Sequence, residues 1–171
     1  GKLGDRVAAA ISRQQPDEAE QGIPPHWNVY VTVDDVDETT GKVEEAGGKV
    51  LAGPFDVFNA GRMSVIADPT GAVLCLWQAG DSIGAEVVNE PGALAWADTA
   101  TPDAEAAQGF YAAVLGWEFD QMSEEPPYWV IRNGDRSQGG MTVPPEGVPA
   151  NWFPYFAVED VDAAMEKVEE A

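Results

Sequence analysis

The chain has 171 residues, of which 44% are apolar, and its 30 acidic and 9 basic residues give a formal net charge of −21. This composition predicts a folded globular protein, and the negative charge excludes nucleic acid and anionic membranes as partners, because both are polyanions. No apolar run approaches the roughly 20 residues that span a bilayer. The single cysteine excludes an internal disulfide. We therefore predict a cytoplasmic protein.

An internal repeat organises the sequence. The segment WNVYVTVDDVDETTGKVEEA (residues 27–46) returns as WFPYFAVEDVDAAMEKVEEA (residues 152–171), with eleven identical positions. This spacing fits a repeated small domain rather than a repeated helical hairpin. The second copy stops at Ala171, whereas the first continues into more strand-like sequence. We therefore expect the chain to be an excerpt of a longer protein.

The first repeated module is predicted as a strand, a helix and three strands. Residues 27–33 alternate between Val and other side chains, which is typical of a strand with two different faces. Asp34 or Asp35 is expected to cap a helix that runs to about Ala46 and ends at the glycines that follow. A turn with the composition of type I is predicted at 68–71. Strands are predicted at 55–58, 63–67 and 72–78.

The same order begins again after a predicted linker at 80–91, which carries Gly, Pro and acidic residues without a period. A strand at 93–99 and a helix at 103–115, ended by Gly116, lead into three short strands. Those strands are predicted at 118–120, 128–132 and 139–143. The fold class is thus α+β with repeated βαβββ modules. The predicted domains are residues 1–79, with a complete module at about 23–79, and residues 92–171, with a module at 92–143 and a truncated one at 150–171.

Several motifs accompany this order: DVD at the helix start, AxxFYxxVLGW at 107–117, and ADPTGAVLCLWQ before the linker. The combination resembles the vicinal oxygen chelate superfamily of glyoxalase I, bleomycin-resistance proteins and extradiol dioxygenases, in particular its two-domain actinobacterial members. The resemblance runs from about Gly4 to Ala171. It implies that paired modules form half-open β-sheet cups with helices outside, and that a cup binds a small molecule. Exposed sheet edges would favour a homodimer with swapped half-domains, and which modules pair is left open.

The resemblance also implies where a metal would be held, with His or Gln in the first strand of a module and Glu in the last. The corresponding positions hold none of these residue types; they are Asn28, Cys75, Trp96, Phe153 and a position near Gly140. Hard divalent cations prefer carboxylate and imidazole donors, so we predict no metal and no cofactor. Glyoxalase I and extradiol dioxygenase activities are then not expected. If the register is shifted by two residues, His26 with Cys75 is the fallback metal pair.

The predicted ligand site is rich in aromatic side chains. The ligand-binding residues that we predict, with Tyr128 as an alternative to its neighbour Trp129, are Asn28, Tyr30, Arg62, Cys75, Trp77, Trp96 and Trp129. Candidate catalytic residues are Cys75, Tyr30 and Asp98. We predict metal-free binding of a small aromatic metabolite or antibiotic. Two alternatives stay open: a lyase, isomerase or hydroxylase-type enzyme acting on such a ligand, and a degenerate structural module in which these residues only fill a core.

Overall fold

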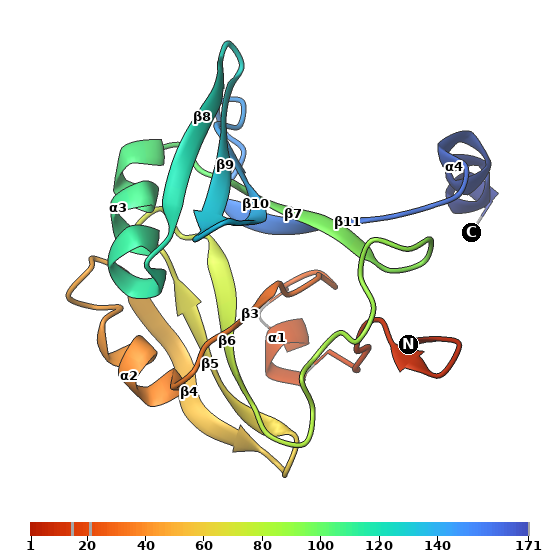
Figure 1. Cartoon of the computed structure of the whole chain (residues 1–171), viewed down its shortest axis with the longest axis horizontal. Coiled ribbons are helices and arrows are strands. Elements are labelled where there is room, and N and C mark those ends of the chain that lie inside the picture. The colour runs from red at the N-terminus through yellow and green to blue at the C-terminus, as the bar shows by residue number, and fades with distance from the viewer. Residues whose placement is uncertain (15, 21, 171) are drawn as a thin grey trace. The chain divides into compact units, whose positions relative to one another are not determined.

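Figure 1 shows a computed structural model of the chain, in which residues 1–14, 16–20 and 22–170 are described. The chain divides into two compact units. The central unit consists of Trp27–Ile83 and Ala97–Phe153, and the peripheral unit consists of Gly1–His26, Gly84–Trp96 and Pro154–Ala171.

The first βαβββ module lies entirely in the central unit. Its elements are β3 (Tyr30–Thr32), α2 (Val36–Gly41), β4 (Lys49–Val57), β5 (Gly61–Ala67) and β6 (Val73–Ala79). The strands form a sheet of order β3-β6-β5-β4, in which β3 runs parallel to β6 and the other neighbours are antiparallel. Helix α2 packs on one face of this sheet (Figure 1). The predicted order of elements is confirmed.

Helix α2 is shorter than the sequence pattern predicts. Asp35 caps it as expected, with its side chain accepting a hydrogen bond from the Glu38 N–H at 2.9 Å. The helix ends at Gly41 rather than near Ala46, because two β-branched threonines followed by a glycine have low helix propensity. The backbone continues through turns to Gly47, and β4 then begins earlier than predicted.

The second module repeats the arrangement. Its elements are β7 (Leu94–Ala100), α3 (Ala104–Leu115), β8 (Glu118–Glu124), β9 (Pro127–Asn133) and β10 (Arg136–Thr142), and its sheet, of order β11-β7-β10-β9-β8, also includes β11 (Asn151–Phe156). Asp103 caps α3 by accepting from the Ala106 N–H at 3.0 Å. Gly116 ends the helix with a φ of 68°, in the left-handed region that glycine tolerates.

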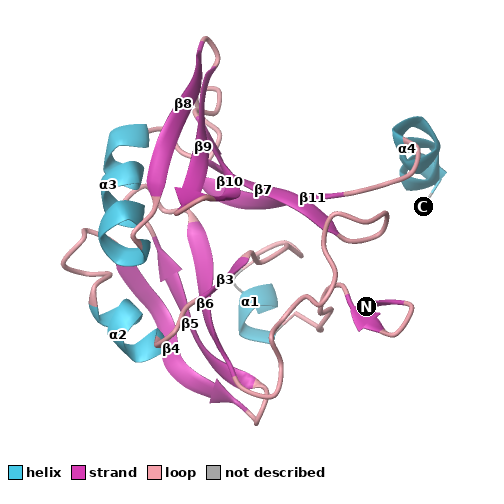
Figure 2. Cartoon of the chain, viewed as in Figure 1, coloured by secondary structure: helices cyan, strands magenta, loops and turns pink. Residues whose placement is uncertain are grey.

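The peripheral unit holds the remaining elements, β1 (Lys2–Leu3), β2 (Arg6–Val7), α1 (Pro16–Glu20) and α4 (Val161–Glu170). Within it, the Arg6 guanidinium donates two hydrogen bonds to the Glu90 carboxylate, at 2.9 and 2.6 Å. Figure 2 shows both helices and strands in the described part of the chain, which confirms the α+β class. In the described part of the chain, no helix is long and apolar enough to cross a membrane.

The helix-bearing faces of the two sheets share one hydrophobic core. It joins residues of the first module to residues of the second, among them Val36, Ile66, Leu74, Leu76, Phe110, Tyr111, Ile131, Met141 and Trp152. Helices α2 and α3 are in contact within this core (Figure 1). Side chains alternate along a strand, so each sheet also has a second face directed away from its helix. We call it the helix-free face.

Candidate functional site

The helix-free face of the first sheet carries three of the predicted ligand residues. Leu74 and Leu76 of β6 are buried in the core, and alternation therefore places Cys75 and Trp77 on the opposite face. The strand register pairs Tyr30 of β3 with Cys75, so their side chains share that face. The register of the sheet thus places Tyr30, Cys75 and Trp77, three of the predicted ligand residues, on one face.

Two aromatic rings lie side by side on this face. The rings of Tyr30 and Trp77 meet edge to face, with centroids 6.3 Å apart, and Tyr30 is 51% exposed. The Trp77 indole N–H donates to the Ser82 carbonyl at 3.0 Å, which fixes the ring. Gly61 of β5 makes room for it, because a Cβ at Gly61 would lie 2.5 Å from the indole. Phe55 of β4, 42% exposed, is on the same face through its register with Met63.

Tyr30 and Cys75 also form a polar pair. Burial, followed by the neighbouring Cys75, raises the pKa of Tyr30 to about 12. Burial raises the pKa of the Cys75 thiol to about 11, although the hydrogen bond with Tyr30 acts in the opposite direction. Both groups are therefore protonated at neutral pH, and Tyr30 is half exposed whereas Cys75 is only 2% exposed. Neither supplies a charge there.

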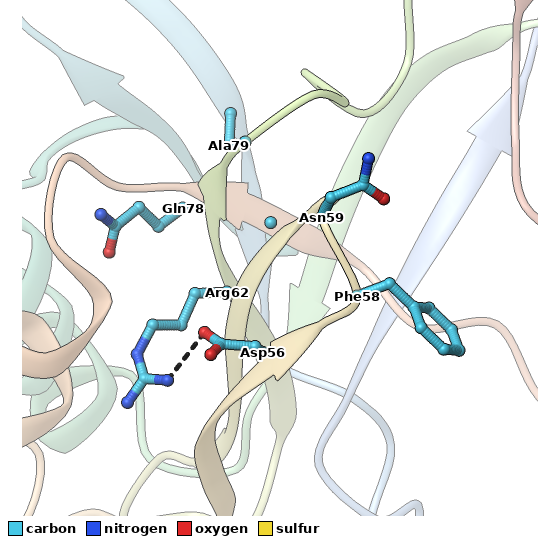
Figure 3. A pocket seen from close by; sticks show the side chains of 8 residues that line it. Asp56, Phe58, Asn59, Arg62, Gln78 and Ala79 are labelled. Atoms are coloured by element: carbon cyan, nitrogen blue, oxygen red, sulfur yellow. Dashed lines mark hydrogen bonds and ion pairs between the residues drawn. The ribbon is translucent and has the colours of Figure 1, made fainter.

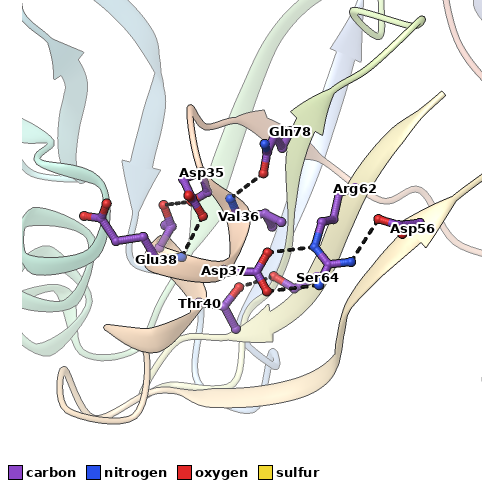
Figure 4. Close-up of polar contacts among 10 residues, drawn as sticks. Asp35, Val36, Asp37, Glu38, Thr40, Asp56, Arg62, Ser64 and Gln78 are labelled. Carbon is purple, nitrogen blue, oxygen red and sulfur yellow. Dashed lines mark hydrogen bonds and ion pairs between the residues drawn. The ribbon is translucent and has the colours of Figure 1, made fainter. Parts of the chain in front are cut away.

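Arg62 lies on the other face of the sheet, which differs from its expected place among the ligand residues. Its register partner is Gln78, whose side-chain oxygen accepts from the Val36 N–H of α2 at 3.0 Å, so both face the helix (Figure 4). The Arg62 guanidinium pairs with Asp37 at 2.7 Å and with Asp56 at 2.9 Å. These two carboxylates raise the pKa of Arg62 and offset its charge.

A shallow hollow of about 280 Å³ opens beside Arg62 at the end of the β4–β5 hairpin (Figure 3). Its lining residues are Asp56, Phe58, Asn59, Gly61, Arg62, Gln78, Ala79 and Gly80. Phe58 stands at the hairpin tip and is 95% exposed. Because the cation in this hollow is already paired with two carboxylates, the hollow offers little attraction to an anionic ligand.

In the second module, Asp98 and Tyr128 come together on the helix-free face. The Tyr128 hydroxyl donates to Asp98 Oδ1 at 3.0 Å, and Asp98 is 6% exposed. Trp129, by contrast, packs against the core, because it alternates with Tyr128 along β9. Trp96 is half-buried in β7, two residues before Asp98. Tyr128, not Trp129, is thus the residue of β9 that presents a functional group on this face. Sequence alternation could identify it only together with the register of β9 in the sheet.

The two remaining candidates precede β3. Asn28 is exposed, and so is His26, whose Nδ1 lies 3.0 Å from the Pro24 carbonyl oxygen. His26 belongs to the peripheral unit and Cys75 to the central one.

The residues at the positions that would hold a metal do not fit a divalent cation. The Cys75 thiol is hydrogen-bonded to Tyr30, and burial raises its pKa to about 11. A thiol must lose its proton to ligate a metal. At Gly140, a Cβ would clash with the Tyr128 hydroxyl and the Asp98 carboxylate, so the space for a ligating side chain is already filled. Among the described residues, no three His, Cys, Asp or Glu side chains form a group that could hold a metal.

Comparison with known sequences shows which proteins the chain resembles. Residues 2–76 match the family model described as the Glyoxalase/Bleomycin resistance protein/Dioxygenase superfamily. The chain is 45% identical over 168 residues to the glyoxylase-like protein CFP32 of Mycobacterium bovis, a match covering 96% of this chain and 64% of that protein. It is 36% identical over 181 residues to the anthracycline biosynthesis protein DnrV of Streptomyces peucetius, covering 96% of this chain and 65% of that protein. The chain thus spans less than two thirds of the length of these relatives.

Solved structures share the fold. A Mn(II)-bound glyoxalase from Novosphingobium aromaticivorans superposes with a TM-score of 0.53 and 17% identity, covering 82% of this chain and 50% of that one. The 2,2',3-trihydroxybiphenyl 1,2-dioxygenase of Sphingomonas wittichii gives a TM-score of 0.55 and 18% identity, covering 82% and 57%. Together with the repeated βαβββ modules, these likenesses show that the chain has the fold of these glyoxalase and dioxygenase structures.

Proposed function

We propose that the helix-free face of the first sheet binds a small planar aromatic molecule without a metal ion. The observation that carries this proposal is the edge-to-face pair of Tyr30 and Trp77 on this face, with Tyr30 51% exposed. Aromatic rings contribute large apolar contact areas and orient a planar ligand by stacking. The Tyr30 hydroxyl adds a neutral hydrogen-bonding group, and the buried Cys75 thiol is hydrogen-bonded to it.

The relatives support the same class of ligand. The name of DnrV describes it as an anthracycline biosynthesis protein, and so does the name of DauV of Streptomyces sp. strain C5, which is 35% identical over 182 residues. Anthracyclines are polycyclic aromatic compounds that present the kind of flat surface expected here. An enzyme acting on such a ligand is the second candidate, but the protonated thiol and phenol favour binding over nucleophilic or basic catalysis.

Quenching of tryptophan fluorescence tests the proposal. 2-(Hydroxymethyl)anthraquinone is a neutral planar probe, and we expect it to bind and to quench Trp77. Trp77→Leu removes one aromatic stacking contact. We expect it to weaken binding by about tenfold, which corresponds to about 1.4 kcal/mol. Calorimetry provides a readout that does not depend on the fluorophore. Turnover of the bound probe or of a related quinone would favour the enzyme.

Trp27→Leu is the matched control. Trp27 is 49% exposed and precedes β3, outside the strands that carry Tyr30 and Trp77. Its replacement should leave the affinity unchanged within about twofold. Equal loss of affinity in both variants, or no binding by the unmodified chain, would contradict the proposal, and the second result would favour a degenerate structural module.

A further inference from the structure

The second sheet carries a polar pair at the position equivalent to Tyr30 and Cys75. In the first module, the parallel register of the first and last strands places Tyr30 opposite Cys75. In the second module, the same parallel register places Asp98 opposite Gly140. Tyr30 and Asp98 lie at the same distance before their helix caps, five residues in each case. One position therefore carries a phenol and a thiol in the first module, and a carboxylate beside a glycine in the second.

The space above Gly140 is filled from the neighbouring strand. A Cβ at Gly140 would clash with the Tyr128 hydroxyl and with Asp98 Oδ1. These two oxygen atoms are 3.0 Å apart, with the hydroxyl donating to the carboxylate. Three adjacent strands, β7, β10 and β9, thus hold a phenol–carboxylate pair in a fixed arrangement. The glycine is required by the pair rather than by its own backbone conformation.

The chemistry of the pair selects a cationic hydrogen-bond donor. A carboxylate only accepts hydrogen bonds, and its two oxygens offer about four lone-pair sites, while the phenol can both donate and accept. Asp98 is 6% exposed. The dielectric constant around a buried carboxylate is lower than in water, so its attraction for a cation is stronger. Hydrogen bonds between ions are roughly twice as strong as neutral ones. The net charge of −21 also favours the approach of cations.

We propose that Asp98 and Tyr128 bind the protonated amine of a small organic ligand, at a site separate from the aromatic face around Trp77. The carboxylate pairs with the ammonium group, and the Tyr128 hydroxyl orients the carboxylate. The two modules then offer different chemistry at equivalent positions, a neutral aromatic site in the first and an anionic site in the second.

Calorimetric titration of the full chain with benzylamine and with benzyl alcohol tests this site. The two probes share a ring and a similar size, but only benzylamine is charged at neutral pH. We expect benzylamine to bind more tightly than benzyl alcohol, and Asp98→Asn to weaken benzylamine binding by about tenfold and to remove the preference. Tyr128→Phe, which keeps the ring, should weaken benzylamine binding by a few fold.

Asp135→Asn is the matched control, since it removes the same charge from an exposed turn between β9 and β10. It should change benzylamine affinity by less than about twofold. Trp77→Leu should also leave benzylamine binding unchanged, which separates this site from the proposed aromatic one. Equal effects of Asp98→Asn and Asp135→Asn would overturn the proposal, because the attraction would then come from the net charge. Equal affinity for the two probes would overturn it as well.

Discussion

At the scale of single residues, the site depends on glycines as much as on side chains with functional groups. Gly61 leaves the space in which the Trp77 indole lies, and Gly140 leaves the space that Tyr128 and Asp98 share. Any other residue at either position would displace the neighbouring polar or aromatic group. Glycine thus controls which chemistry is presented on each helix-free face.

Cys75 gives the clearest prediction at this scale. Burial raises its pKa to about 11, against 9.0 for an ordinary thiol, so its thiolate fraction near pH 8 should be about a hundredfold lower. It is the only cysteine, so alkylation by iodoacetamide followed by mass spectrometry reports it alone. We expect slow labelling at pH 8, with a rate that rises with pH to a midpoint near 11.

The same shift in pKa has a consequence for stability. The folded chain holds the Cys75 proton more tightly than the unfolded chain, so this contribution to stability is complete below about pH 9 and is lost as the pH rises through 11. The urea-unfolded chain is the reference for labelling. A labelling midpoint near pH 9 in the folded chain would contradict the inferred environment, because poor access alone slows the reaction without moving the midpoint.

At the scale of elements, α3 is tied to the first module by a buried hydrogen-bond chain. The Tyr111 hydroxyl donates to Asp68 Oδ2 at 2.9 Å and accepts from the Trp152 indole N–H at 2.7 Å. Asp68 Oδ1 in turn accepts from the backbone N–H groups of Thr70 and Ala72. The DPTG turn, predicted only as a local turn, therefore also anchors a helix of the other module.

Tyr111→Phe tests this anchor. The change removes a donor from a buried carboxylate and the acceptor from a buried indole, so we expect it to lower the free energy of unfolding by about 2–4 kcal/mol in urea denaturation. Phe58→Leu changes a ring that is 95% exposed and should cost less than about 0.5 kcal/mol. Equal stability of the two variants would show that the chain of hydrogen bonds contributes nothing.

The sequence predicted the order of elements because its signals are local. Asp35 and Asp103 cap the N-termini of the two helices, and Gly116 ends the second helix. Alternating side chains along the sequence indicate the strands. It misplaced the end of α2, where two threonines and a glycine outweighed the apolar period. The faces of Arg62 and Trp129 depend on strand register, and a shift of one residue reverses the face of a side chain. That information lies in the pairing of distant strands.

At the scale of the whole molecule, the two repeated modules pack against each other through equivalent faces. Their helix-bearing faces share one core, so the Tyr30–Trp77 pair of the first module and the Asp98–Tyr128 pair of the second lie on the faces directed away from it. In the second sheet, β7 pairs with β11, which repeats the sequence of the β3 region, whereas β3 ends the described first sheet. A first strand from another module would extend that sheet, and we propose that a homodimer with swapped half-domains supplies it.

The central claim is that the aromatic face binds its ligand without a metal ion, and one titration tests it most directly. Protein purified without metal affinity and treated with a chelator is titrated with 2-(hydroxymethyl)anthraquinone, before and after addition of manganese, nickel, zinc or ferrous iron. We predict the same affinity in every case, because the positions that would hold a metal offer a protonated thiol and a glycine covered by Tyr128. Binding that appears only after a metal is added would contradict the account.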